Sequence, residues 1–462
     1  MAEETIARER LPHDLAAERA VLGGVLADRK VFSEIGTLLR SEDFHHEGHA
    51  AIYDAFVHLE TTSQPIDALT VSAALKATGK LGLSGGPVYL AELESSVPTV
   101  ANTRSYALLV QQKAIKRRMI EISRELSSMA SEPATPVDSL LDEAQRRIFA
   151  ISERHQQGDL RPFSDVLDKT LETIDALRNS GGGVTGLSTG FADLDQMLTG
   201  LHSGELIIVA ARPGCGKTSL ALNVCCHAAL REKKAVAVFS LEMPEDQLAM
   251  RLLSSETRVD MKRIREGRLG AAHMEKISHA AGELWNAPLY IDDSGSLSSF
   301  ELRTKVRRLK TRISKLEPPQ ELGLVMVDYL QLMRQHGKVE SRQQEVQEIS
   351  RSLKSLAKEL EVPVVALSQL NRKVEERRGQ KGKPMLSDLR ESGAIEQDAD
   401  VVLFIHREQD EDEEGAVHVA GQGVDVELII AKQRNGPTGS VPLLLFAECT
   451  RFENKLKDGM MQ

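Results

Sequence analysis

The most informative segment of the chain is Leu206-Ile207-Ile208-Val209-Ala210-Ala211, followed at once by Arg212-Pro213-Gly214-Cys215-Gly216-Lys217-Thr218-Ser219. Six apolar residues of strand length run into a glycine-rich loop, and a helical pattern begins directly after it. This order of strand, loop and helix is the context of a phosphate-binding P-loop, whose backbone N–H groups and helix N-terminus cradle phosphates. Arg212 to Ser219 are therefore the predicted nucleotide-binding residues.

Two side chains of this loop have predicted roles in binding ATP. Lys217 would reach the β- and γ-phosphates, and the hydroxyl group of Thr218 would hold Mg²⁺. Ala211 stands where the general P-loop pattern has glycine, so we expect a backbone conformation there that does not require a positive φ.

Polar residues end three further strand-like runs. Leu324–Asp328 ends in an acid, a pattern that places a carboxylate beside the Mg²⁺ of a bound nucleotide. Glu242 follows another apolar run and could orient or deprotonate an attacking water molecule. Gln369 ends a third run and could sense the γ-phosphate. Alternatively, each acid is simply a solvated residue after a strand.

The C-terminal part of the chain alternates strand and helix patterns. Continuous apolar strands with helical crossovers predict a parallel sheet buried on both faces, whereas the closely spaced last strands predict an antiparallel extension. The fold class is therefore α/β, a P-loop domain built on a mostly parallel sheet. Its predicted strands are Leu206–Ala211, Val236–Leu241, Leu324–Asp328, Val364–Ser368, Val401–Ile405, Val426–Ala431 and Val441–Phe446.

The N-terminal part is predicted to be all-helical. Short amphipathic helices occupy residues 12 to about 100, and two long helices, 103–129 and 136–154, form an αα-hairpin. Thr135-Pro136 supplies an N-cap hydroxyl and a proline at the first helical position of the second helix. The apolar stripe of this hairpin would pack either within the domain or against another subunit.

A linker with one short helix, Phe163 to Leu177, and the glycine triplet Gly181-Gly182-Gly183 separates the two parts. The predicted organisation is an all-helical domain at 1–155, a linker at 156–185 and the P-loop α/β domain at 186–462.

The histidines near position 45 and the cysteines are possible metal ligands, but their patterns favour a structural role. His45, His46 and His49 lack a carboxylate that would complete a recognisable metal pattern. The cysteines (Cys215, Cys225, Cys226 and Cys449) form no C-x-x-C pair, so we expect four reduced thiols.

Composition limits the class of protein. Hydrophobic residues make up 41% and charged residues 27% of the 462 residues, as in ordinary globular proteins, and no apolar run is long enough to span a membrane. The charged N-terminus has no apolar core of a secretory signal, which predicts a cytoplasmic protein. The net charge of −10 argues against a generally basic nucleic-acid coat, so DNA binding requires local basic segments.

Taken together, the motifs resemble the DnaB family of bacterial replicative helicases, which implies a RecA-like fold for the P-loop domain. Each short motif is weak, but their order and spacing cover the whole RecA-like domain. The N-terminal Leu11-Pro12-His13-Asp14-Leu15-Ala16-Ala17-Glu18 and the helical hairpin extend the likeness over nearly the full chain. The matching stretches are Leu187–Phe191, Ala211–Thr218, Ser240–Met243, Val327–Leu332, Leu367–Arg372, Asp388–Gly393 and Lys432–Gly436.

The resemblance implies a homohexameric ring that encircles one DNA strand, moves 5′ to 3′ and binds ATP with Mg²⁺ between neighbouring subunits. By similarity, Arg434 would be a finger donated in trans to the neighbour's γ-phosphate, with Lys432 assisting. Arg390, Glu391 and Gly393 would lie on a pore loop that contacts DNA. Primase and a helicase loader are the implied partners. Alternatively, Lys432 and Arg434 form an exposed basic hairpin.

Local charge agrees with a DNA-binding pore. From Asn371 to Arg390, seven basic and three acidic residues give a net charge of +4. A basic loop of this kind binds single strands through phosphates without reading sequence, although a merely solvated loop is the alternative. Glu408 to Glu414 contains six acids in seven residues and is expected to be solvated away from DNA.

Two other functions compete with a helicase motor. A different RecA-like ATPase, such as a recombinase or a signalling ATPase ring, would share the P-loop but not the N-terminal hairpin or the Arg390–Gly393 motif. A scaffold that binds nucleotide without turnover would not need Glu242, Asp328 and Arg434.

Overall fold

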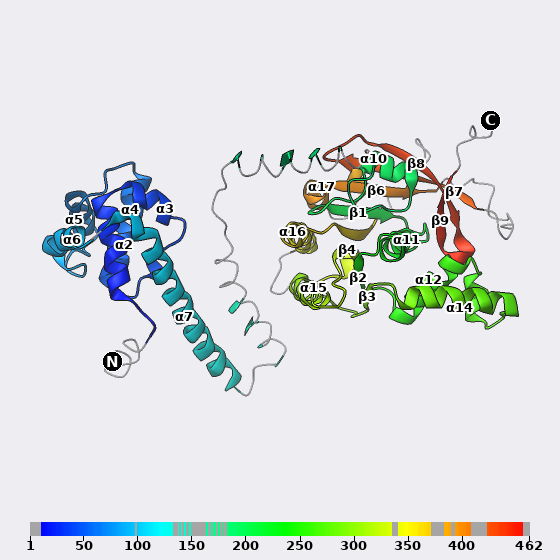
Figure 1. Cartoon of the computed structure of the whole chain (residues 1–462), viewed down its shortest axis with the longest axis horizontal. Coiled ribbons are helices and arrows are strands. Elements are labelled where there is room, and N and C mark those ends of the chain that lie inside the picture. Colours follow the sequence, from blue (N-terminus) through cyan, green and yellow to red (C-terminus); the bar gives the residue numbers. More distant parts are fainter. Residues whose placement is uncertain are drawn as a thin grey trace. The chain divides into compact units, whose positions relative to one another are not determined.

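The computed structural model describes residues 11–97, 99–132, 183–334, 341–370, 383–389, 393–407 and 423–455, with isolated positions between 137 and 178. The chain divides into two compact units, Met1–Leu167 and Asp168–Gln462 (Figure 1). Each unit has a hydrophobic core of its own and is described separately.

The first unit is all-helical in its described residues, as predicted. Its core consists mainly of aliphatic and aromatic side chains from the inner faces of the helices, including the fully buried Tyr53 and Phe56. Arg117 of the longest helix donates hydrogen bonds to the carbonyl oxygens of Pro12 and Asp43, which ties that helix to the start of the unit. The helices are α2 (Leu15–Ala27), α3 (Lys30–Ile35), α4 (Glu47–Thr61), α5 (Ala68–Ala77), α6 (Gly86–Ser95) and α7 (Thr103–Ala130).

The predicted hairpin is present where residues are described. α7 matches the first predicted helix, and the described positions between 137 and 148 are helical. Arg147 forms ion pairs with Glu143 one turn earlier and with Glu125 of α7. The described positions between Phe163 and Leu177 are also helical.

The histidine cluster is structural. His49 is buried, its Nδ1 lies 2.7 Å from Glu18 Oε2, and its Nε2 lies 2.7 Å from the Tyr89 hydroxyl. The Nδ1 atom of His46 accepts a hydrogen bond from the backbone N–H of Gly48 and caps α4, and His45 stacks on His13. No group of side chains suited to a metal ion occurs in the described part of the chain.

The second unit is a nine-stranded sheet in the order β3-β2-β4-β5-β1-β6-β7-β8-β9 (Figure 1). The strands from β3 to β6 in this order are parallel, and β7, β8 and β9 extend the sheet antiparallel, as predicted. The strands are β1 (Leu206–Ala211), β2 (Ala235–Ser240), β3 (Leu289–Asp292), β4 (Leu322–Asp328), β5 (Val364–Gln369), β6 (Val401–His406), β7 (Val424–Gln433), β8 (Gly439–Phe446) and β9 (Arg451–Asn454).

Two strands, β3 and β9, are absent from the sequence prediction. Both are four residues long, and β3 is half-buried at an edge of the sheet, so neither contains the continuous apolar run that identified the others.

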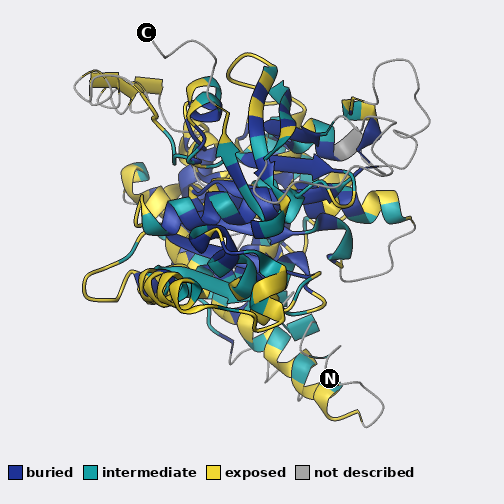
Figure 2. Ribbon diagram, turned by 90° about the vertical axis from the view of Figure 1, so that its right-hand side faces the viewer, coloured by how far each residue is buried: buried dark blue, intermediate teal, exposed yellow. Residues whose placement is uncertain are grey.

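Helices cover both faces of the sheet, so its central strands are buried (Figure 2). Alternate residues of β1 serve the two cores: Ile207 and Val209 pack with α11, whereas Leu206 and Ile208 pack with α15 and α16. The helices are α10 (Ala192–Leu198), α11 (Lys217–Leu230), α12 (Glu245–Thr257), α13 (Met261–Arg265), α14 (Ala271–Trp285), α15 (Ser299–Ile313), α16 (Arg342–Leu360) and α17 (Gly393–Asp398).

Candidate nucleotide-binding site

The predicted P-loop connects β1 to α11. Ala211 is the last residue of β1, and α11 begins at Lys217. Gly214 and Gly216 have φ values of +81° and +85°, a region that favours glycine. Ala211 is not among the described residues with positive φ, so the alanine at this position is accommodated as expected.

Asp328 and Thr218 meet at this edge of the sheet. The register pairs Ser240 of β2 with Asp328 of β4, which brings the ends of the two strands together beside α11. The Thr218 hydroxyl donates a hydrogen bond to Asp328 Oδ2 at 2.7 Å. The other carboxylate oxygen, Oδ1, is buried without a hydrogen bond and lies 3.6 Å from the ammonium of Lys217.

These oxygens suit a magnesium ion. Mg²⁺ prefers carboxylate and hydroxyl oxygens and is usually held by one or two protein groups together with phosphates. Asp328 is 1% exposed, and Thr218 orients its carboxylate through Oδ2. The other oxygen, Oδ1, accepts no hydrogen bond from the described residues and can therefore coordinate a cation. Thr218 and Asp328 therefore fit the predicted metal ligands.

Lys217 is a charged group held in a largely buried environment. Burial lowers the pKa of its ammonium group, and the nearby negative charges of Asp328 and Glu242 oppose that shift. The same ammonium lies 4.4 Å from the centre of the Tyr329 ring, at a distance typical of a cation–π contact. The P-loop cation is thus positioned by an acid and an aromatic face.

Glu242 differs from Asp328 in its exposure. It follows β2 and is exposed, and the backbone N–H of the preceding Leu241 donates to the Asp328 carbonyl at 2.7 Å. This hydrogen bond fixes the turn that carries Glu242 against the end of β4. An exposed carboxylate at this edge can meet solvent water, as general-base chemistry requires.

Arg251 of α12 interacts electrostatically with two acids of the site, a relation that the sequence did not indicate. Burial lowers the pKa of its guanidinium, while Asp328 and Glu242 act in the opposite direction. Its proximity to these acids arises from the packing of α12, and no motif in the sequence links position 251 to the P-loop.

Gln369 lies at the end of β5, next to the end of β1, because the register pairs it with Ala211. Gln331, also missed as a site residue, follows β4 and connects the end of that strand to the end of β5. Its amide donates to the Ser368 hydroxyl at 2.9 Å and accepts from the Gln369 backbone N–H at 3.4 Å. Lys217, Thr218, Glu242, Asp328 and Gln369 are thus brought to one edge of the sheet.

Arg434 and Lys432 lie at the opposite edge. The register pairs Lys432 with Val402 near the start of β6, and the backbone N–H of Arg434 donates to the Asp400 carbonyl. Asp400 in turn bonds Leu206, the first residue of β1, whereas the P-loop follows the last residue. Five residue steps along β1 correspond to about 16 Å. The structure therefore does not bring Arg434 to the P-loop of its own chain.

The predicted DNA contacts are only partly described. Arg390 and Glu391 lie outside the described residues, and Gly393 is the first residue of α17. Of the basic segment, residues 371–382 are outside the described part, and Lys383 forms an ion pair with Glu427 of β7 at 2.6 Å. The acidic run from Glu408 to Glu414 is also outside the described residues.

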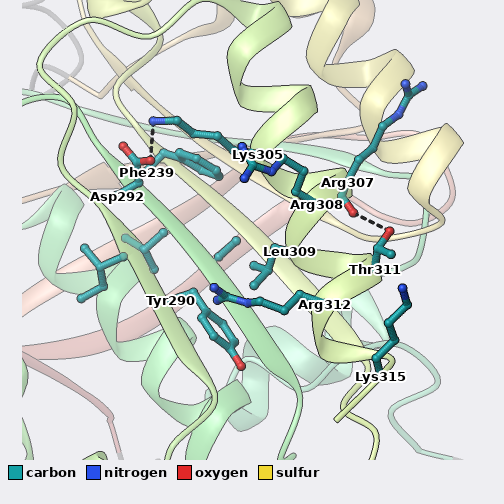
Figure 3. A pocket seen from close by; sticks show the side chains of 13 residues that line it. Phe239, Tyr290, Asp292, Lys305, Arg307, Arg308, Leu309, Thr311, Arg312 and Lys315 are labelled. Atoms are coloured by element: carbon teal, nitrogen blue, oxygen red, sulfur yellow. Dashed lines mark hydrogen bonds and ion pairs between the residues drawn. The ribbon is translucent and has the colours of Figure 1, made fainter.

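A separate groove of about 780 Å³ lies between α15 and strands β2 and β3 (Figure 3). Its floor includes Phe239, and its rim carries basic side chains of α15. Lys305 bonds Asp292 at 2.5 Å, and the guanidinium of Arg312 lies over the Tyr290 ring. None of its lining residues belongs to the P-loop, so it is distinct from the nucleotide site.

Known families match both units. Residues 186–454 match the DnaB-like helicase C terminal domain, and residues 10–112 match the DnaB-like helicase N terminal domain. The chain belongs to the DnaB family of replicative DNA helicases. It is 43% identical over 450 residues to the replicative DNA helicase DnaB of Geobacillus stearothermophilus, covering 96% of each protein. It is 44% identical to that of Pasteurella multocida, covering 96% of this chain and 94% of the relative.

Solved structures agree with this membership of the DnaB family. One describes a DnaB-like replicative helicase and its interactions with primase; it is 31% identical, with a TM-score of 0.71, and the match covers 96% of this chain and 100% of that one. A second structure, of an isolated ATPase domain, is 36% identical with a TM-score of 0.58, and the match covers 64% of this chain and 100% of that one.

Family membership establishes the activity: the chain is a replicative DNA helicase that uses ATP. The match to both DnaB domains favours this activity over the alternative of another RecA-like ATPase, which would share only the motor. Among the described residues, no helix is long and apolar enough to cross a membrane.

Proposed function

We propose that ATP and Mg²⁺ bind at the P-loop edge of the sheet and that a neighbouring subunit completes the site. Arg212 to Ser219 hold the phosphates, Lys217 contacts the β- and γ-phosphates, and Thr218 and Asp328 hold Mg²⁺. When bound, Mg²⁺ neutralises negative charge on the phosphate oxygens. The observation that carries the proposal is the convergence of Lys217 and Thr218 on the Asp328 carboxylate, at 3.6 Å and 2.7 Å respectively.

The hydrolytic step follows from the positions of the polar side chains. Glu242 accepts a proton from a water molecule whose oxygen attacks the γ-phosphorus, and the bond from that phosphorus to the β,γ-bridging oxygen breaks. The products are ADP, inorganic phosphate and a proton. Gln369, beside Ala211, contacts the γ-phosphate and so distinguishes ATP from ADP. Arg251 adds positive charge near Glu242 and Asp328.

Arg434, assisted by Lys432, acts on the nucleotide of the next subunit. Its anchoring near Leu206, at the other end of β1 from the P-loop, supports a role in trans. A guanidinium donated across a subunit boundary stabilises the charge that develops on the transferred phosphoryl group. This arrangement requires identical subunits in head-to-tail contact. For this assembly we propose a closed homohexameric ring that moves 5′ to 3′ on single-stranded DNA.

Subunit mixing tests this arrangement. An Arg434→Ala subunit keeps its P-loop, and a Lys217→Ala subunit keeps its finger. Neither homohexamer should hydrolyse ATP, but mixed rings should recover hydrolysis at interfaces that pair an intact P-loop with an intact finger. If mixed rings form and remain inactive, the trans role is wrong, because a finger acting in cis would leave every site without one essential group.

The remaining assignments belong to the same proposal. Arg390, Glu391 and Gly393 contact the DNA backbone in the pore, and primase and a loader bind the ring. The similarity to a helicase described with its interactions with primase supports primase as a partner.

The proposed domain organisation is a helical domain at 1–155, a linker at 156–185 and a motor at 186–462. It is consistent with the family matches at 10–112 and 186–454. The protein acts in the cytoplasm, where the bacterial chromosome is replicated.

A further inference from the structure

Asp400, between α17 and β6, joins three parts of the motor unit. Its side chain is 7% exposed, and its Oδ2 accepts hydrogen bonds from the backbone N–H of Leu206 at 2.8 Å and from the ammonium of Lys354 at 2.5 Å. Its backbone N–H donates to the Leu206 carbonyl at 2.9 Å. Asp400 is therefore itself fixed to the first residue of β1 and to α16.

The same residue holds Arg434 in two ways. The Asp400 carbonyl accepts from the backbone N–H of Arg434 at 3.0 Å, and its Oδ1 lies 3.4 Å from Arg434 Nη1. The Arg434 guanidinium, 46% exposed, also donates from Nη2 to the Gln397 carbonyl in α17. One face of the guanidinium group is thus restrained while the rest of it remains open to solvent.

Lys432 is attached to the same place. Its ammonium donates to the carbonyl oxygens of Glu396 and Ala399, at the C-terminal end of α17. Carbonyl groups in the last turn of a helix lack intrahelical partners and attract cations. Both basic residues are therefore held by one short segment, α17 with Asp400, and that segment begins at Gly393 of the predicted DNA motif.

We propose that Asp400 is a positioning residue for the finger: it fixes the main chain and the guanidinium of Arg434 so that the finger is presented to the neighbouring subunit's nucleotide. This inference rests on the proposed trans role of Arg434. It assigns Asp400 no contact with nucleotide. A misplacement of about 1 Å in a positioned group can lower the rate of a reaction about 10²-fold. We therefore expect the restraint of the Arg434 side chain by Asp400 to raise the rate of ATP hydrolysis by a comparable factor.

The test uses the mixed rings of Lys217→Ala and Arg434→Ala subunits. All hydrolysis there comes from interfaces at which a Lys217→Ala subunit donates its finger to the intact P-loop of an Arg434→Ala subunit. Asp400→Asn is placed either on the finger-donating subunit, which also carries Lys217→Ala, or on the receiving subunit, which also carries Arg434→Ala. On the donor, kcat should fall roughly 10²-fold while KM for ATP and the affinity for a fluorescent ATP analogue stay unchanged. On the receiver, kcat should fall by no more than about tenfold.

The possible outcomes separate the two proposals. If the parent mixture, made of Lys217→Ala and Arg434→Ala subunits without Asp400→Asn, shows no hydrolysis, the proposed trans role of Arg434 is wrong. If the parent mixture is active and Asp400→Asn on the donor costs nothing, the positioning role is wrong. An equal or larger loss on the receiver would also overturn it, because Asp400 would then be acting through β1 on its own P-loop.

Two variants control for folding and for charge. Asp425→Asn removes an exposed acid of β7 that pairs with Lys455, and it should leave both mixtures unchanged. If Asp400→Asn fails to assemble, the double variant Asp400→Asn with Lys354→Met also removes the ammonium left without its carboxylate. The same asymmetry between donor and receiver is expected for the double variant, and its absence counts against the proposal.

Discussion

Among individual residues, the two acids of the nucleotide site differ in their environments. Asp328 is almost fully buried, oriented by Thr218 and close to the Lys217 ammonium, which suits a fixed ligand. Glu242 is exposed at the end of a neighbouring strand, which suits a group that exchanges a proton with water. The substitution of each acid should therefore impair a different step.

Glu242→Gln should leave ATP affinity nearly unchanged and reduce kcat by about 10²- to 10⁴-fold, because the amide keeps the shape of the side chain but cannot accept the proton. Single-turnover hydrolysis and equilibrium binding of an ATP analogue measure the two effects. Lys217→Ala is the comparison, and it should abolish turnover by removing the charge that holds the phosphates. A large loss of affinity with normal turnover of bound ATP in Glu242→Gln would contradict the role of Glu242.

Among the strands and helices, the short strand β9 shapes the P-loop. Phe452 of β9 lies so close to Gly216 that a Cβ atom there would sit 2.9 Å from two ring carbons. Gly216 is also in the left-handed region, with φ of +85°. A strand near the C-terminus of the motor unit therefore limits which residue can precede α11.

Gly216→Ala should lower the thermal stability of the motor unit and its ATP affinity. The left-handed conformation alone costs an L-residue about 1–2 kcal/mol, and the contact with Phe452 adds to that cost. Gly214→Ala is the matched control for stability, since Gly214 has φ of +81° but no heavy atom within 4 Å of the added Cβ. Calorimetry of the full chain should show a larger loss for Gly216→Ala. Equal losses would mean that Phe452 does not constrain the loop.

The packing of α2 on α4 depends on Glu18. Burial acts to raise the pKa of Glu18, but hydrogen bonds from His49 and from the backbone N–H groups of His45 and His46 outweigh burial and hold the pKa below its usual value. A carboxyl with a lowered pKa contributes stability above the pKa of the unfolded chain, and this contribution is lost as the pH falls through the folded pKa. The first unit should thus lose stability as the pH drops below about 4.5, the ordinary pKa of glutamate.

Glu18→Gln should destabilise α2 and α4 by about 1–3 kcal/mol at neutral pH and remove part of this acid dependence. Hydrogen exchange of the amides in α2 and α4, measured in the full chain, reports the effect locally. Glu60→Gln is the control, because Glu60 forms an exposed ion pair with Arg29 that is expected to contribute about 0–1 kcal/mol. Equal protection in the two variants would show that the Glu18 network contributes little.

For the molecule as a whole, an acidic protein must bind an acidic polymer. The net charge is −10, so DNA affinity depends on local basic groups, which we propose lie in the pore of the ring. The affinity for single-stranded DNA should fall steeply with salt and vary little among sequences at fixed salt. Arg390→Ala should reduce the slope of log K against log salt by about 0.7, and Arg29→Ala, in the helical unit, should not. A strong preference for one sequence would argue against backbone contacts.

Local patterns in the amino-acid sequence are sufficient to predict the fold class, the seven longer strands and the motifs at their ends. Continuous apolar runs and the P-loop are read from neighbouring residues, and parallel strands bring their carboxyl ends to one edge of a sheet. Lys217, Thr218, Asp328 and Gln369 can therefore be grouped from the sequence, because they end or follow the strands β1, β4 and β5, which are neighbours in the sheet. The strands β3 and β9 escape such prediction because they are too short to form apolar runs.

Contacts between residues far apart in the chain follow instead from tertiary packing. Arg251 approaches Glu242 and Asp328 through helix packing, and Phe452 closes over Gly216 from a strand more than two hundred positions away. Asp400 joins β1, α16 and Arg434 in the same way. Such contacts leave no periodic or local signal, because they depend on the sheet order β3-β2-β4-β5-β1-β6-β7-β8-β9 and on the register of its strands.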